Sequence, residues 1–143
     1  MTAKDFLRQL ARKDAHIDAL IQRQQHYYDL AARRTPVYRA DGSGGTRRRS
    51  SCEEYVCKAV DLGREIDRRI DEYVDLTRQI ETAIAQLQDD RYRDILTWRY
   101  INGWRWEQIA QAMGFDVKWV WKLHGRALAE IQIDHGKRLN NVL

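Results

Sequence analysis

Several cationic and aromatic side chains near the C-terminus have the spacing of one helix face. Lys118, Lys122 and Arg126 recur at intervals of four residues, and Trp121 lies between the first two. Residues four apart on a helix are neighbours, so these side chains would form one outward ridge. Cationic side chains pair with phosphates, and aromatic residues are favoured at contact surfaces. The ridge therefore predicts a surface that could bind double-stranded DNA.

The helix that carries this ridge is expected to begin near Val117, after a tight turn. Ala110 is small enough for a helix crossing, Gly114 tolerates left-handed φ, and Asp116 can cap the next helix by accepting a backbone N–H. Apolar residues at intervals of three and four continue on both sides of the turn: Ile109, Met113, Val120, Leu123, Ala127, Leu128 and Ile131. The pattern predicts a helix-turn-helix, a motif that also occurs in all-α proteins that never touch nucleic acid.

Residues 91–128 resemble region 4 of bacterial sigma-70-type factors. The residues that carry the resemblance are Leu96, Arg99, Tyr100, Gly103, Glu107, Ile109, Ala110, Gly114 and Val120. With the long helical segment before it, the chain resembles small phage regulators of the ArpU type, which are reported as activators of late phage genes. The resemblance spans roughly residues 55–131, and its C-terminal third is the specific part.

The resemblance implies a set of DNA-contacting residues, which together with the ridge comprises Arg105, Val117, Lys118, Trp121, Lys122 and Arg126. Arg105 stands where the family has a Ser or Thr cap. An arginine can reach a phosphate, yet it cannot accept the cap hydrogen bond. Because Val117 and Trp121 are apolar, hydrogen-bonded base reading is limited, and Trp121 could instead pack on sugar edges or on another protein.

All five tryptophans lie between Trp98 and Trp121. We expect Trp98, Trp106 and one of the pair Trp119 and Trp121 to be structural, with the other member of the pair exposed. A large aromatic side chain left in water on a recognition helix is typical of a contact surface.

Composition bounds the fold and the chemistry. The chain has 143 residues, one proline, 32% charged residues and a formal net charge of +4, which with its long periodic stretches predicts an all-α protein. Cys52 and Cys57 lack zinc-site spacing, and the four histidines have no matched nucleophile or acid. We therefore expect no enzyme, metal or cofactor. The absence of a membrane-length apolar run and of a signal segment predicts a cytoplasmic protein.

Two long segments are expected to form an antiparallel coiled-coil hairpin. One stripe follows Phe6, Leu10, Ile17, Leu20 and Tyr27, with Lys13 and Gln24 as polar interruptions; the other follows Val56, Ala59, Gly63, Ile66, Ile70, Tyr73, Thr77, Ile80, Ile84 and Leu87. The predicted organisation is a first helix over residues 1–34, a flexible loop over 35–52, a second helix over 53–88, the helix-turn-helix domain over 89–133 and a tail over 134–143. A hairpin of two helices leaves surface under-buried, which favours a homodimer or higher oligomer.

Charge is distributed unevenly along the chain. Residues 33–49 hold six arginines and one aspartate, and of these Arg47, Arg48 and Arg49 form a cluster that could contact DNA phosphates non-specifically or simply solvate a linker. Residues 50–88 hold nine acidic and five basic residues. Such a segment repels DNA and suits protein contact.

Three functions fit these features. The first is a phage-encoded, sequence-specific transcriptional regulator that acts on promoter DNA with host RNA polymerase. The second is a DNA-packaging adaptor resembling small terminase subunits, which usually place the DNA-binding motif first rather than last. The third is a protein-interaction module with a degenerate helix-turn-helix.

Overall fold

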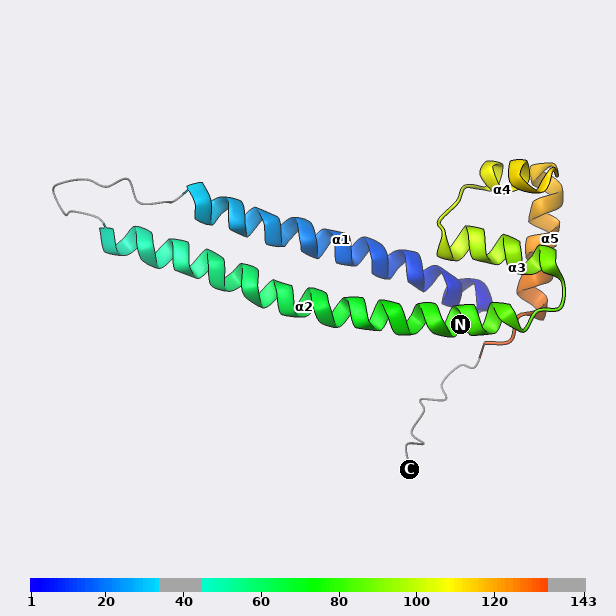
Figure 1. Cartoon of the computed structure of the whole chain (residues 1–143), viewed down its shortest axis with the longest axis horizontal. Coiled ribbons are helices and arrows are strands. Elements are labelled where there is room, and N and C mark those ends of the chain that lie inside the picture. The colour runs from blue at the N-terminus through cyan, green and yellow to red at the C-terminus, as the bar shows by residue number, and fades with distance from the viewer. Residues whose placement is uncertain (34–44, 134–143) are drawn as a thin grey trace, which may run out of the picture. The chain divides into compact units, whose positions relative to one another are not determined.

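The computed structural model describes residues 1–33 and 45–133, without the side chains of residues 45–50. Within these ranges the regular elements are all helical, which confirms the all-α prediction: α1 (Ala3–Arg33), α2 (Gly45–Ala85), α3 (Asp90–Leu96), the π-helical turn η1 (Thr97–Ile101), α4 (Trp106–Met113) and α5 (Val117–Glu130) (Figure 1). The chain divides into two compact units. One is Lys13–Tyr73, and the other combines Met1–Arg12 with the chain from Val74 onward.

The helix boundaries differ from the predicted ones chiefly at the start of α2. This helix begins at Gly45 instead of Glu53, so residues 45–52 are helical and the prediction that they belong to a loop was wrong. The serines and arginines of this stretch are compatible with a helix, and no proline follows Pro36 to break one. The rest of the predicted loop (residues 35–44), the predicted tail over residues 134–143 and the side chains of Arg47, Arg48 and Arg49 lie outside the described residues.

The unit Lys13–Tyr73 is an antiparallel pair of helix segments (Figure 1). Lys13 Nζ lies 3.6 Å from a Glu72 oxygen, and Cys52 Sγ is 3.4 Å from the Ala31 carbonyl oxygen. Low numbers on α1 therefore meet high numbers on α2, as an antiparallel hairpin requires. A cluster of Leu20, Leu62 and Ile66 forms the apolar centre, with Tyr27 packed against it.

Gln24 marks a polar layer in this seam, as the sequence predicted. Its side-chain amide nitrogen donates to the Ala59 carbonyl oxygen at 3.0 Å. The same nitrogen would lie 2.9 Å from a Cβ added to Gly63, so a larger residue there would displace it. A satisfied polar contact of this kind favours one register between two helices, because a shifted register would deprive the half-buried amide of this partner.

The apolar stripe predicted on α2 coincides only in part with the residues that face α1. Ala59 and Ile66 are buried in the seam, but the other seam positions are taken by Leu62 and Arg69, while Val56 and Ile70 are exposed. α2 carries several sets of residues at intervals of three and four, so periodicity alone did not identify the inner one. Because Arg69 is charged, the seam positions do not form an uninterrupted apolar pattern in the sequence.

Arg69 occupies its seam position by directing its charge to the edge. Its guanidinium nitrogens lie 3.8 Å from a Glu65 oxygen and 3.5 Å from a Glu72 oxygen, while Nε is buried with no hydrogen-bond partner. A long side chain can bury its aliphatic stem and keep its charge among acidic neighbours. Lys13, Glu65, Arg69 and Glu72 thus form a charged edge of the hairpin.

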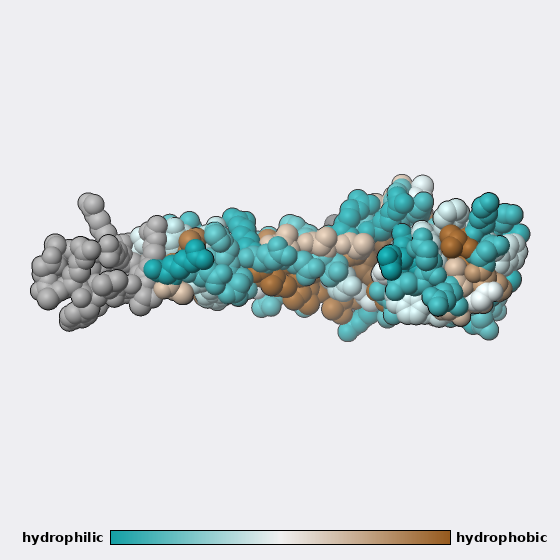
Figure 2. All heavy atoms as spheres, turned by 90° about the horizontal axis from the view of Figure 1, so that it is seen from above, coloured by the Kyte–Doolittle hydropathy of each residue, from teal (hydrophilic) through white to brown (hydrophobic). Residues whose placement is uncertain are grey.

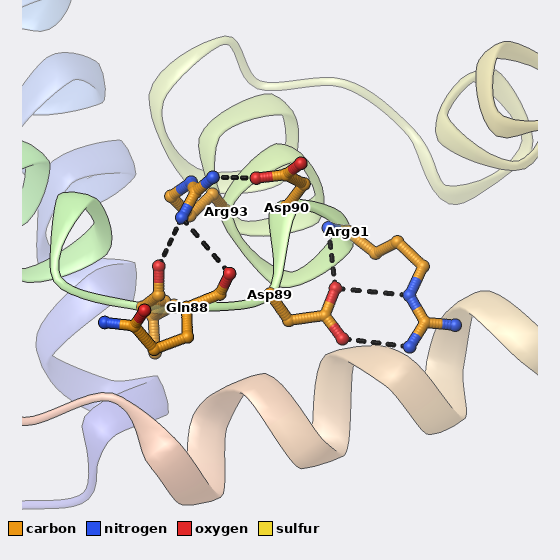
Figure 3. A network of polar contacts seen from close by, with 6 residues as sticks. Gln88, Asp89, Asp90, Arg91 and Arg93 are labelled. Atoms are coloured by element: carbon orange, nitrogen blue, oxygen red, sulfur yellow. Dashed lines mark hydrogen bonds and ion pairs between the residues drawn. The ribbon is translucent and has the colours of Figure 1, made fainter.

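The second unit is built around a short, capped α3. Asp89 Oδ1 accepts the Arg91 backbone N–H at 2.9 Å, and the Arg91 side chain returns two bonds to the same carboxylate at 3.2 and 2.9 Å (Figure 3). The side-chain hydrogen bonds from Arg91 lower the pKa of Asp89. Arg93 contacts Asp90 and donates to the backbone carbonyl oxygens of Leu87 and Gln88 (Figure 3). These contacts connect the start of α3 to the preceding turn.

Candidate nucleic-acid interface

The turn between α4 and α5 has the predicted geometry. Gly114 adopts φ +69°, and the turn is closed by bonds from Gly114 N to Gln111 O at 3.3 Å and from Phe115 N to Ala110 O at 3.1 Å. Asp116 Oδ1 then accepts the Trp119 backbone N–H at 2.7 Å, so α5 begins at Val117 as expected. The left-handed φ favours glycine, and the aspartate supplies the cap.

α5 is seated on α3 and α4 by one apolar face. Val120, Leu123 and Ala127 on this face are fully buried. On the facing helices Ile95 and Ile109 are also fully buried, and Ala110 is buried as the predicted small crossing residue. This packing fixes the rotation of α5 and hence decides which of its side chains reach solvent.

The opposite face of α5 is an open ridge, which we define as Lys118, Trp121, Lys122 and Arg126. All four are exposed, with Trp121 at 51%. Trp119 is half-buried, and the Arg126 guanidinium carbon lies 5.3 Å from the centre of its ring. Of the predicted pair, Trp121 is therefore the exposed member. Three cations and one aromatic side chain thus share one surface, a composition suited to the phosphates and sugar edges of a duplex.

Arg105 and Val117 lie in places that are less favourable for contacting DNA than those of the ridge residues. Arg105 is exposed at the start of α4 and its side chain makes no cap hydrogen bond. Gln108 compensates in part, since its Oε1 accepts the Arg105 backbone N–H at 3.0 Å. Val117 is half-buried in the first turn of α5, which leaves only part of its side chain available for a thymine methyl group.

The π-helical turn η1 that precedes this motif was not predicted from the sequence. Asn102 N bonds to Thr97 O at 3.0 Å across five residues, and Trp104 N bonds to Trp98 O at 2.9 Å. The rings of Trp98 and Trp104 stack at 5.1 Å, and both are half-buried. Trp98 is therefore structural, although it is less buried than a core residue. π-turns are rare, and spacings of three and four residues predict ordinary helical turns instead.

Arg99 contributed only to the family resemblance in the sequence analysis, but in the structure it contacts both Trp104 and Trp106. Its guanidinium carbon lies 4.4 Å from the centre of the Trp106 ring, and one guanidinium nitrogen donates to the Trp104 carbonyl oxygen at 2.9 Å. A guanidinium stacked on an indole and bonded to a carbonyl holds both partners in place. Arg99 thus connects η1 to the beginning of α4.

His124 is the buried polar residue of α5, and sequence reasoning missed its role. Its Nε2 lies 2.8 Å from the Tyr100 hydroxyl, and the edge of Trp106 meets its ring at 4.7 Å. Burial lowers the pKa of His124 to about 4, and the nearby charges of Lys4, Arg99 and Arg8 act in the same direction. Burial also raises the pKa of Tyr100. The pair is neutral at physiological pH and joins η1 to α5.

The free energy of unfolding should therefore fall as the pH is lowered from 7 to 5. His124 stays neutral in the folded chain, whereas the unfolded chain takes up a proton below its ordinary pKa near 6.5, so the stabilisation is complete above that value and is lost towards pH 4. The expected loss at pH 5 is about 2 kcal/mol. Urea unfolding followed by tryptophan fluorescence measures it. In His124→Gln the loss should be much smaller, and an unchanged loss would assign the pH dependence to other groups.

Metal binding and membrane insertion are two further properties on which the described residues bear. No group of three or more His, Cys, Asp or Glu side chains in residues 1–33 and 51–133 is arranged to hold a metal ion. Over the same part of the chain, no helix combines the length and apolar character needed to span a membrane.

Comparison with known families supports the sigma-like character of the C-terminal helices. Residues 77–131 match the family model described as sigma-70, region 4. The match begins in the last turns of α2 and ends just after α5, so it covers less than half of the chain and is shorter than the resemblance expected from residue 55. No curated protein and no solved structure matches the chain. These helices therefore form a sigma-70 region 4-like helix-turn-helix, a domain type that implies DNA binding.

Proposed function

We propose that this chain is a sequence-specific DNA-binding transcriptional regulator of bacteriophage origin, related to the ArpU type. α5 enters the major groove of promoter DNA, and the protein works in the bacterial cytoplasm with host RNA polymerase, as a homodimer or higher oligomer. The observation that carries the proposal is the open ridge on α5 of a region 4-like motif. In helix-turn-helix proteins the second helix reads the groove.

The ridge residues have separate roles in this proposal. Lys118, Lys122 and Arg126 neutralise phosphates and supply affinity, while Trp121 packs against sugar or base edges and contributes to sequence preference. Arg105 reaches a phosphate from the start of α4, and Val117 meets a thymine methyl. Arg47, Arg48 and Arg49 add non-specific contacts to DNA phosphates.

Selection of bound sequences from a random duplex pool tests this function directly. The full chain is expected to enrich one sequence motif and to bind it far more tightly than unselected DNA. Trp121→Ala should then weaken binding to the selected duplex more than binding to an unselected one, as measured by fluorescence anisotropy at fixed salt. Equal weakening of both would remove Trp121 as a specificity residue. Failure to enrich any motif would contradict the regulator, and ring-shaped assemblies would favour the packaging adaptor.

A further inference from the structure

The helical hairpin has an exposed apolar edge that its own fold leaves uncovered. We define this apolar edge by five large apolar residues of the unit Lys13–Tyr73, each 39–44% exposed: Ile21, Tyr28, Val56, Val60 and Ile70. Isolated apolar residues on a surface are ordinary, whereas a continuous group suggests a contact surface. Figure 2 shows hydrophobic residues in brown at the surface of the long helices.

The spacing places these residues on one side of the hairpin. On α1, Ile21 follows the buried Ile17 by four residues; on α2, Ile70 follows the buried Ile66 by four. In an antiparallel pair, positions with the same offset from the seam lie on the same side of it. The contact between Gln24 and the Ala59 carbonyl sets the register, which brings Tyr28 level with Val56.

The other side of the hairpin has the opposite chemistry. Glu65 directly precedes the seam residue Ile66, and Glu72 lies two helical turns after Glu65 on the same face. Both glutamates therefore lie on the far side from the apolar edge, where they pair with Arg69 and Lys13 at 3.5–3.8 Å. Burying those ion pairs in an interface would cost desolvation. The hairpin is thus amphipathic across its seam, and the apolar edge is the side suited to contact.

We infer that the apolar edge binds the same edge of a second copy of this chain, with the two α2 helices antiparallel around a twofold axis near residue 65. This arrangement places Val60 opposite Ile70 of the second copy. It also places Arg64 opposite Asp67 of the second copy, and by symmetry both contacts occur twice, as in an isologous interface. Arg64 now pairs with Asp61 at 3.6 Å, but both side chains are at least 75% exposed, so that contact is weak and can be exchanged.

The dimensions of this face are close to those of a stable dimer. The part of α1 in this unit has about twenty residues, hence a length of about 30 Å, and two helices side by side are about 20 Å wide. The face therefore covers roughly 600 Å², against about 800 Å² buried per partner in a typical specific interface. This arrangement rests on the homodimer of the proposed function and specifies its surface, and its failure is distinguishable from a failure of DNA binding because oligomeric state is measured without DNA.

Sedimentation equilibrium of the full chain under reducing conditions tests the inference. The wild-type chain should have the mass of a dimer, and Val60→Glu combined with Ile70→Glu should raise the dimer dissociation constant by at least about 100-fold, because four charges enter an apolar contact. Ala19→Glu, at an exposed position of α1 outside the apolar edge, should leave the dimer intact. Circular dichroism verifies that all chains stay helical. A monomeric wild-type chain, or a double variant that dimerises normally, overturns the inference.

A charge exchange tests the antiparallel pairing itself. In an Arg64→Asp homodimer, the new aspartate faces Asp67 of the other copy at both symmetric contacts. In an Asp67→Arg homodimer, the new arginine faces Arg64 of the other copy. Each variant should therefore dimerise at least about tenfold more weakly than wild type. An equimolar mixture restores both pairs between unlike chains and should form a heterodimer. A mixture that associates no better than either variant alone would rule out the arrangement.

Discussion

Replacing Lys118, Lys122 and Arg126 together with alanine is expected to lower the affinity for the selected duplex by about 1000-fold. Each side chain is exposed on the ridge, and none forms an ion pair within the described residues that it would have to give up. A hydrogen bond to a charged group contributes about 1.5 kcal/mol or more, which is at least tenfold in binding. The three side chains are neighbours on α5, but in this proposal each contacts a separate phosphate, so their contributions are expected to add approximately.

Salt dependence identifies the kind of contact that is lost. Each phosphate neutralised on a duplex contributes about 0.9 to the slope of log affinity against log salt, so the triple variant should lose about 2.7 units of slope if all three cations contact phosphate. Anisotropy titrations at several salt concentrations measure both quantities. A large loss of affinity with an unchanged slope would mean that the cations contact bases or protein instead.

A matched control separates the ridge from the overall charge of the chain. Arg12, Arg68 and Arg78 are exposed on α1 and α2, and replacing them with alanine removes the same three positive charges. The regulator model expects this control to bind DNA within a few-fold of wild type. If both triple variants weakened binding equally, net charge would explain the affinity and the ridge would have no special role.

The helix-turn-helix could be predicted because its signals are local. Gly114 permits the left-handed turn, Asp116 caps the next helix, and the apolar spacing of α5 fixes which face is buried. Each signal depends on residues within one or two turns, so the sequence alone specified the exposed ridge. The side chains on that ridge follow from the same spacing.

The hairpin and the aromatic cluster were harder to predict because they depend on residues distant in the chain. Arg69 lies in the seam with its charge paired to Glu65 and Glu72, and the apolar Ile70 lies outside it. The bond between Tyr100 and His124 joins residues 24 positions apart through an irregular turn. Periodicity describes one helix at a time, so it could not select the inner stripe or find this pair.

Leu123→Ala is expected to lower the free energy of unfolding by about 3 kcal/mol, because a fully buried leucine leaves a cavity that its surroundings fill only partly. Leu128→Ala removes the same atoms from a half-buried position of α5 and should cost about 1 kcal/mol. Urea unfolding followed by tryptophan fluorescence measures both changes. Equal costs would contradict the assignment of Leu123 to the seat of α5.

The Leu123→Ala variant also distinguishes the structural role of the buried face of α5 from the DNA-binding role of its exposed ridge. Leu123→Ala leaves every ridge residue in place, so at a temperature where the variant is folded its affinity for the selected duplex should remain within a few-fold of wild type. On warming, affinity should fall in step with the folded fraction, at a lower temperature than for wild type. A large loss in the fully folded variant would instead mean that small rotations of α5 move the ridge, and that the packing of Leu123 sets the position of Trp121 and its cationic neighbours on DNA.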